Sequence, residues 1–110
     1  MKVTAWNNGE YHQTGAGYGF KISAADRDLY FMKAWKSVLI TLPNGSEIEV
    51  NTDKASKASL WNDSCRKLIN KEIGAWLIES GHAPWPKQAP PTFELQPTKE
   101  RHFTLNERAT

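Results

Sequence analysis

The sequence VLITLPNGSEIEV, residues 38–50, carries the clearest folding signal in the chain. Its apolar side chains alternate with polar ones on both sides of the Pro-Asn-Gly-Ser run at 43–46. Alternation with a period of two is typical of a strand that buries one face, and Gly45 can adopt the positive φ that a tight turn requires. The stretch therefore predicts a β-hairpin with Glu47 and Glu49 on its solvent face.

Further strands are predicted on both sides of this hairpin. Residues 3–6 form a first short strand, and residues 17–22 form a second strand that the chain enters through glycines. Towards the other end, residues 92–95 and 102–105 alternate and predict a closing hairpin. Residues 59–61 are predicted as a short strand or a loop.

Two helices are predicted from their capping residues. Ser23 can cap a short helix over residues 24–33, because its hydroxyl can accept a hydrogen bond from a free backbone N–H of the first turn. We expect Leu29 and the Tyr30/Phe31 pair of this helix to face inward. Asn70 can cap a second helix over residues 71–80, where apolar side chains recur at helical spacing and a glycine follows at the expected stop.

These elements predict a mainly β fold with two short α-helices, arranged as an open barrel (pseudobarrel) of about seven strands. A chain of 110 residues is expected to form a single domain over 1–110, with residues 106–110 as a flexible tail. The chain contains one cysteine, Cys65, so it cannot form an internal disulfide. Such sparse use of cysteine fits a reducing compartment. No secretory leader or membrane-spanning segment is visible, so the sequence predicts a soluble, cytoplasmic protein without membrane partners.

The glycine-rich run at 15–19 does not have the context of a phosphate-binding loop. Such loops join a strand to a helix, so that the helix N-terminus faces the phosphate, whereas this run enters a strand. Glycine in a strand is more typical of a bend or bulge. The three histidines lack partners at metal-ligand spacing, and no catalytic constellation is visible. We therefore expect a binding module, with no enzymatic activity, cofactor or metal site.

Several short motifs follow one another in a characteristic order. They are TGAGYGFKIS at 14–23, DLYF at 28–31, the hairpin at 38–50, WLIESG at 76–81, FEL at 93–95 and FTL at 103–105. In this order they resemble the DNA-binding pseudobarrel of plant B-three transcription factors and of the effector domains of some restriction enzymes. The resemblance covers about residues 3–105. The chain departs from the family at 89–91, where Ala-Pro-Pro replaces the usual Gly-Asp, and the Pro-Trp-Pro of 84–86 matches no family pattern.

The resemblance implies that the protein grips the major groove of double-stranded DNA with two arms. The implied arms are residues 7–14 and residues 57–67. The residues predicted to contact DNA are Asn7, Asn8, Tyr11, His12, Gln13, Thr14, Lys21, Lys57, Asn62, Arg66 and Lys67. Their chemistry is suitable, because amides and arginine can read base edges and lysine can contact phosphates. The residues alone fit ordinary solvent-exposed loops equally well.

The sequence thus predicts a non-catalytic module that reads duplex DNA. The net charge of +2 is low for this role, so the prediction requires the basic residues of the two arms to share one face. The alternative is a protein-interaction module or accessory subunit, with a protein partner or a homo-oligomer as the complex. In that case Trp85 and the prolines of 83–91 would form the contact surface, unless Trp85 instead plugs the end of the barrel.

Overall fold

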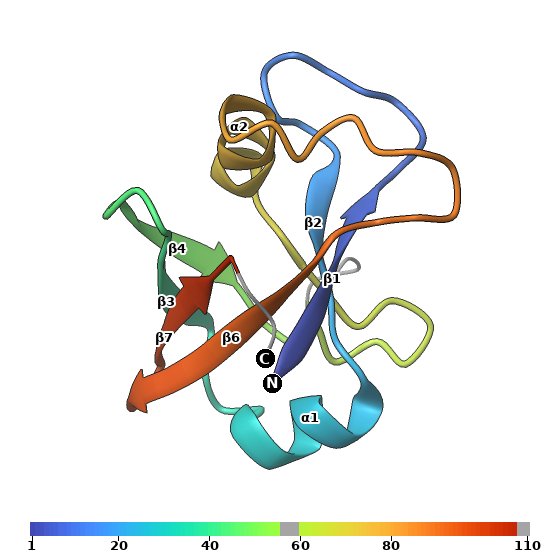
Figure 1. Ribbon diagram of the computed structural model, residues 1–110. Coiled ribbons are helices and arrows are strands. Elements are labelled where there is room, and N and C mark those ends of the chain that lie inside the picture. Colours follow the sequence, from blue (N-terminus) through green and yellow to red (C-terminus); the bar gives the residue numbers. More distant parts are fainter. Residues whose placement is uncertain (56–59, 108–110) are drawn as a thin grey trace.

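Within residues 1–55 and 60–107, which the computed structural model describes, seven strands form one mixed sheet that curls into an open barrel (Figure 1). The strands are β1 (Lys2–Asn7), β2 (Tyr18–Lys21), β3 (Ser37–Thr41), β4 (Glu47–Asn51), β5 (Lys67–Ile69), β6 (Thr92–Lys99) and β7 (His102–Asn106). Their order across the sheet is β4-β3-β7-β6-β1-β2-β5, and only the β3–β7 pair among them is parallel. The predicted fold class is confirmed.

Two helices, α1 (Ala24–Tyr30) and α2 (Lys71–Glu79), begin at the predicted capping residues. The Ser23 hydroxyl accepts a hydrogen bond from the backbone N–H of Asp26 at 3.1 Å, and the Asn70 side chain accepts one from the N–H of Glu72 at 2.7 Å. These bonds satisfy backbone donors that have no partner inside a helix. Neither helix of the described ranges is long and apolar enough to cross a membrane.

Of the residues predicted to face inward, Phe31 is buried and Tyr30 is half-buried against the core, but the prediction was wrong for Leu29. Leu29 is 72% exposed, whereas Arg27 is only 7% exposed. The helix ends at Tyr30, earlier than the predicted end at residue 33, so it is too short to develop an apolar stripe. The apolar residue that packs this segment against the barrel is Phe31, directly after the helix. Its ring stacks on that of Phe103 in β7, with centroids 4.8 Å apart.

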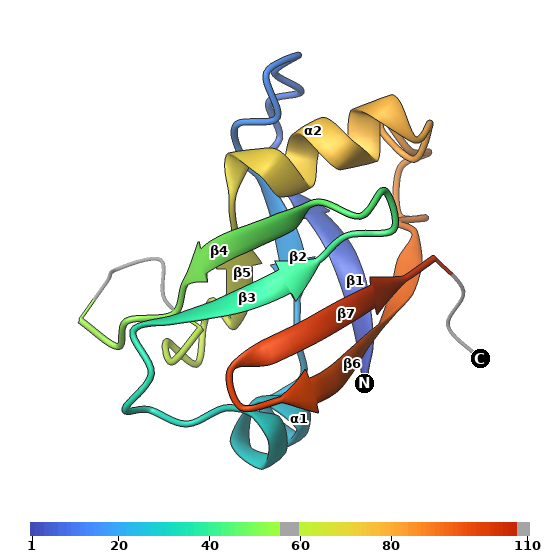
Figure 2. The same cartoon turned by 90° about the vertical axis from the view of Figure 1, so that its left-hand side faces the viewer.

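The two edge strands, β4 and β5, face each other across the opening of the barrel (Figure 2). Asn70, between β5 and α2, bridges this opening with its side-chain amide. The Nδ2 group donates to the backbone carbonyl of Glu49 on β4 at 2.9 Å, while the Oδ1 atom caps α2. One side chain therefore fixes both the start of α2 and its distance from β4.

The inside of the barrel is filled by the alternating apolar residues of the strands and by one face of α2. Phe93 lies at its centre, with its ring 5.7 Å from Phe20 and 5.3 Å from Trp76. Val38, Ile40 and their partners on β4 are buried, and Glu47 and Glu49 are exposed, as the hairpin pattern predicts.

Three boundaries differ from the sequence predictions. Of residues 59–61, predicted as a short strand or a loop, Leu60 and Trp61 lie in a turn and residue 59 is outside the described residues. The strand that follows, Lys67–Ile69, was not predicted. Three residues are too few to show a period in the sequence. The closing hairpin is longer than predicted, and Asn106 of the predicted tail belongs to β7. Residues 108–110 lie outside the described part of the chain.

Candidate nucleic-acid interface

The first predicted arm, residues 7–14, lies at the end of β1 and in the loop 8–17 that joins β1 to β2, which is called the first loop. Asn7, the last residue of β1, donates from its amide to the carbonyl of Glu10 at 3.0 Å and accepts from the N–H of Gly9 at 2.7 Å. Asn8 accepts from the N–H of Glu10 at 3.0 Å. These two asparagines shape the loop, so their amide groups are already partly engaged within it.

The tip of this loop is exposed. His12 pairs with Glu10 through Nε2 and Oε2 at 2.9 Å, and the hydroxyl of Thr14 accepts from the N–H of Ala16 at 3.4 Å. The side chain of Gln13 is exposed and makes no hydrogen bond with the residues that the structure describes. Gln13 is therefore the amide of this arm that is free to contact a ligand.

Two sets of contacts hold the first loop to the barrel. The rings of Tyr11, Tyr18 and Trp85 form an edge-to-face cluster, with all three centroid separations between 5.9 and 6.1 Å. At the other side of the loop, the backbone of Gly15 lies directly against the backbone of Gly74 on α2. Trp85 is thus half-buried against two tyrosines rather than free in solvent.

The second predicted arm, residues 57–67, precedes β5 in the chain and includes its first residue, Lys67. The structure describes residues 60–67 of this arm, of which 60–66 are called the second loop. Asn62 organises its end, because its side chain accepts from the N–H and the hydroxyl of Ser64 at 3.0 and 2.7 Å. The carbonyl of Asn62 also accepts from the N–H groups of Cys65 and Arg66. The predicted contact residue Lys57 lies outside the described residues.

Arg27 holds this second loop against α1 and was not singled out from the sequence. Its guanidinium bonds to the carboxylate of Asp63 at 2.9 Å and to the carbonyl of Leu60 at 3.3 Å, and it lies 5.2 Å from the ring centroid of Trp61. Burial alone lowers the pKa of Arg27, but its hydrogen bonds and charge interactions with Asp63 and Asp28 together raise it above the ordinary value. In the sequence, an arginine between two aspartates on a short helix is typical of a solvent-exposed residue. The pattern therefore gives no indication that Arg27 is buried against the second loop.

The outer face of β1, β2 and β5 lies between these two loops. Register places Thr4, Lys21 and Lys67 side by side in one row across the three strands. The next row contains Trp6, Gly19 and Ile69, and the Nζ atom of Lys67 lies 4.4 Å from the ring centroid of Trp6. None of these three strands contains an acidic residue.

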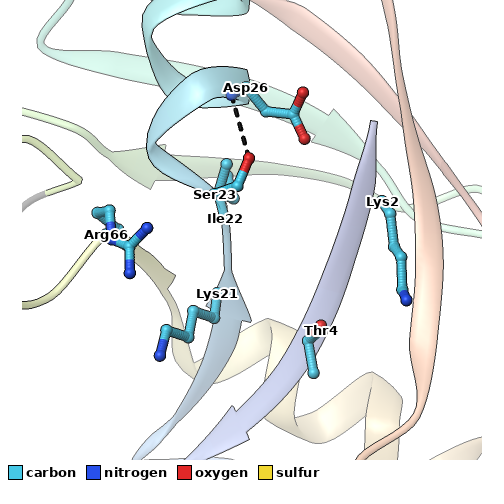
Figure 3. A pocket seen from close by; sticks show the side chains of 7 residues that line it. All are labelled: Lys2, Thr4, Lys21, Ile22, Ser23, Asp26 and Arg66. Atoms are coloured by element: carbon cyan, nitrogen blue, oxygen red, sulfur yellow. Dashed lines mark hydrogen bonds between the residues drawn. The ribbon is translucent and has the colours of Figure 1, made fainter.

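A surface cavity of about 340 Å³ opens at the end of this face near α1 (Figure 3). Lys21 and Arg66 lie on one side of the cavity, Lys2 and Thr4 come from β1, and Ser23 and Asp26 come from the start of α1. The backbone N–H of Ile22 donates to the carbonyl of Arg66 at 2.9 Å, which fixes the second loop to the end of β2.

Acidic residues gather on other elements. β4 presents Glu47 and Glu49 to solvent, and α2 presents Glu72 and Glu79. Neither β3 nor β4 contains a lysine or arginine. The net charge is low because the cations on β1, β2 and β5 are largely cancelled in the sum by acidic residues on other elements, among them β4 and α2. We call the first surface the cationic face and the second the acidic region.

The structure brings together only some of the predicted contact residues. Lys21, Arg66 and Lys67 share the cationic face, whereas Asn7 to Thr14 lie at the opposite end of β2 and Asn62 lies within the second loop. Because β2 is antiparallel to both β1 and β5, the two loops extend from opposite ends of the face (Figure 1). Lys2, Thr4 and Trp6 complete the face and were not singled out. The available signal was the alternation of Thr4 and Trp6 on the first predicted strand, with Lys2 just before it.

No protein-family model matches the chain, and neither a curated protein nor a solved structure matches it. Within 1–55 and 60–107, no group of three or more histidine, cysteine or acidic side chains is placed to hold a metal ion. The candidate interface is therefore described by its own geometry: a sheet face formed by β1, β2 and β5, with cations and no acidic residue on these strands and a polar loop at each end.

Proposed function

We propose that the protein is a non-catalytic module that binds duplex DNA. The binding surface is the outer face of β1, β2 and β5, with the two arms, residues 7–14 and 57–67, flanking it. The observation that carries this proposal is the concentration of Lys2, Lys21, Arg66 and Lys67 on and beside strands that lack any acidic residue.

The cations on the sheet face suit the phosphate backbone of DNA, and the polar groups on the arms suit the edges of its bases. Lysine and arginine neutralise backbone phosphates, which supplies affinity that does not depend on sequence. Exposed Gln13 can form a paired hydrogen bond to the edge of an adenine in the major groove. The pseudobarrel that the sequence resembles supports the same two-arm arrangement.

A salt titration tests the proposal. Fluorescence anisotropy of a labelled random duplex of about two helical turns is measured between about 50 and 200 mM NaCl. We expect the logarithm of the affinity to fall linearly with the logarithm of salt concentration, because each neutralised phosphate releases counterions. Absence of binding at low salt, or an affinity independent of salt, would overturn the proposal.

Single lysine variants identify the surface. Lys21→Gln should lower the salt slope by about 1, because it removes one phosphate contact. Lys99→Gln, at the far end of β6, removes the same charge away from the proposed surface and serves as the matched control. Equal effects of the two substitutions would show that the binding is not located on the β1–β2–β5 face.

A protein-interaction role for residues 83–91 remains the second proposal. Pro84, Pro86 and Lys87 are exposed in this segment, while Trp85 contacts Tyr11 and Tyr18. The contact surface would then consist of the prolines and Lys87, with Trp85 as their support. A failure of the DNA titration would make this segment the next surface to test.

A further inference from the structure

The cavity beside α1 contains cations that have no anionic partner in the protein. Lys2, Lys21 and Arg66 line it, and none of them forms an ion pair with a carboxylate of the described residues. Asp26 lines the same cavity without pairing with them. Three cationic side chains and one carboxylate leave an excess of positive charge, which an anion carrying about two negative charges would neutralise.

Arg66 is held in an unusual position for a surface arginine. Its backbone has a φ of 48°, in the left-handed region, and its carbonyl is bonded to the N–H of Ile22. Its Nε–H is shielded from solvent and has no acceptor among the described residues. A buried donor without a partner is uncommon in folded proteins, and a bound anion at this position would supply an acceptor for it.

Hydroxyl donors complete the lining. The oxygen of Ser23 accepts from the N–H of Asp26, which leaves its own hydrogen free to donate, and the Thr4 hydroxyl also lines the cavity (Figure 3). Arginine and hydroxyl donors together with lysine charges are the groups that bind phosphate oxygens.

We propose that this cavity is a binding site for a phosphate group, with Arg66 as its principal ligand. The phosphate can come from the DNA backbone or from a free phosphate monoester. The DNA source rests on the proposed function, whereas binding of free phosphate does not. Lys21 and Arg66 were predicted from the sequence as separate DNA contacts. The sequence could not join them with Lys2, Thr4 and Ser23, because the five residues come from β1, β2, the start of α1 and the second loop.

NMR of the ¹⁵N-labelled protein tests the site directly. Sodium phosphate is titrated against NaCl of matched ionic strength, while the side-chain Nε–H of Arg66 and the backbone amides of Lys21 and Ser23 are followed. We expect these signals to shift and saturate with phosphate, with a Kd in the millimolar range for a single small anion. The chloride control should leave them nearly unchanged. The same signals are then followed during titration with the random duplex.

Each combination of results decides the inference. Saturating shifts with both ligands support the site and identify DNA phosphate as a source. Shifts with phosphate but no DNA binding support the site and overturn the proposed function. DNA binding that leaves these signals unchanged, with no response to phosphate, overturns the site and leaves the proposed function in place. No response to either ligand overturns both.

Variants assign the role of each cation. Arg66→Lys keeps the charge but removes the Nε donor, and it should weaken phosphate binding about tenfold, which corresponds to about 1.4 kcal/mol. Lys21→Gln, at an exposed position, tests the same cavity if the Arg66 variant does not fold. Lys99→Gln is the control and should bind phosphate as the unaltered protein does. Unchanged binding in both cavity variants would overturn the proposal.

Discussion

At the level of single residues, Arg27 combines three kinds of contact. Its guanidinium bonds to Asp63 and to the carbonyl of Leu60, and it also lies over the ring of Trp61. Asp63 is 87% exposed, so the ion pair itself contributes little. The bond from the buried guanidinium to the Leu60 carbonyl and the ring contact are better protected from solvent. Arg27 therefore positions the second loop mainly through its buried contacts.

The substitution Arg27→Met tests this role. It preserves a long apolar stem but removes the hydrogen bonds, and we expect it to lower the free energy of unfolding by about 1–3 kcal/mol in urea titrations. Lys33→Met is the control, because Lys33 is exposed and also lies near the ring of Trp61. Its effect should stay within about 0.5 kcal/mol. Similar losses in both variants would contradict a specific role for Arg27.

Tyr18 provides a pH-dependent prediction. Burial raises its pKa above the ordinary value of 10.0, and the nearby Tyr11 raises it further. A folded-state pKa above the unfolded value means that the stabilisation is fully present below about pH 10 and is lost as pH rises through the folded pKa. The difference in absorbance at 295 nm between the unaltered protein and Tyr18→Phe should therefore titrate with a midpoint above 10.0. A midpoint at or below the ordinary value would contradict the burial argument.

At the level of elements, the contact between the first loop and α2 depends on two glycines. A Cβ atom at Gly74 would lie against the backbone of Gly15, and a Cβ atom at Gly15 would lie against Lys71 and Ala75. The backbone of Gly15 also has a φ of 93°, which disfavours any other residue. The first glycine of the run at 15–19 thus allows close packing between loop and helix.

The substitution Gly74→Ala separates helix propensity from packing. Alanine is the better helix former by about 1 kcal/mol, so propensity alone predicts a more stable protein. We expect the reverse, a loss of about 1–3 kcal/mol in urea unfolding, because the added methyl group displaces the first loop. Glu79→Ala, at an exposed position of the same helix, should change stability by less than about 0.5 kcal/mol. A gain in stability for Gly74→Ala would show that the loop moves aside freely.

The elements differ in how far the sequence could predict them. The hairpin at 38–50 and the caps of both helices were predicted because they depend on neighbours along the chain. The inward position of Arg27 and the contact of Gly15 with Gly74 depend on segments that are distant in sequence, and local patterns contain no information about them. The same distinction applies to the candidate site: Lys21, Arg66 and Lys67 were named individually, but sheet register was needed to join them with Lys2, Thr4 and Trp6.

At the level of the whole molecule, the position of charges matters more than their sum. The net charge of +2 by itself argues weakly for DNA binding. The fold, however, separates the cations of β1, β2 and β5 from the carboxylates of β4 and α2. We propose that an extended anion such as DNA contacts the face of β1, β2 and β5, where these cations lie.

Neutralising the acidic hairpin distinguishes local charge from net charge. The double variant Glu47→Gln/Glu49→Gln raises the net charge without altering the β1–β2–β5 face. We expect the salt slope of duplex binding to stay unchanged, because the slope counts the phosphates neutralised at the interface. Lys21→Gln/Lys67→Gln changes the charge by the same amount in the opposite direction and should lower the slope by about 2. If the two double variants instead shift affinity and slope equally in opposite directions, overall charge governs the binding, and the two-arm interface is wrong.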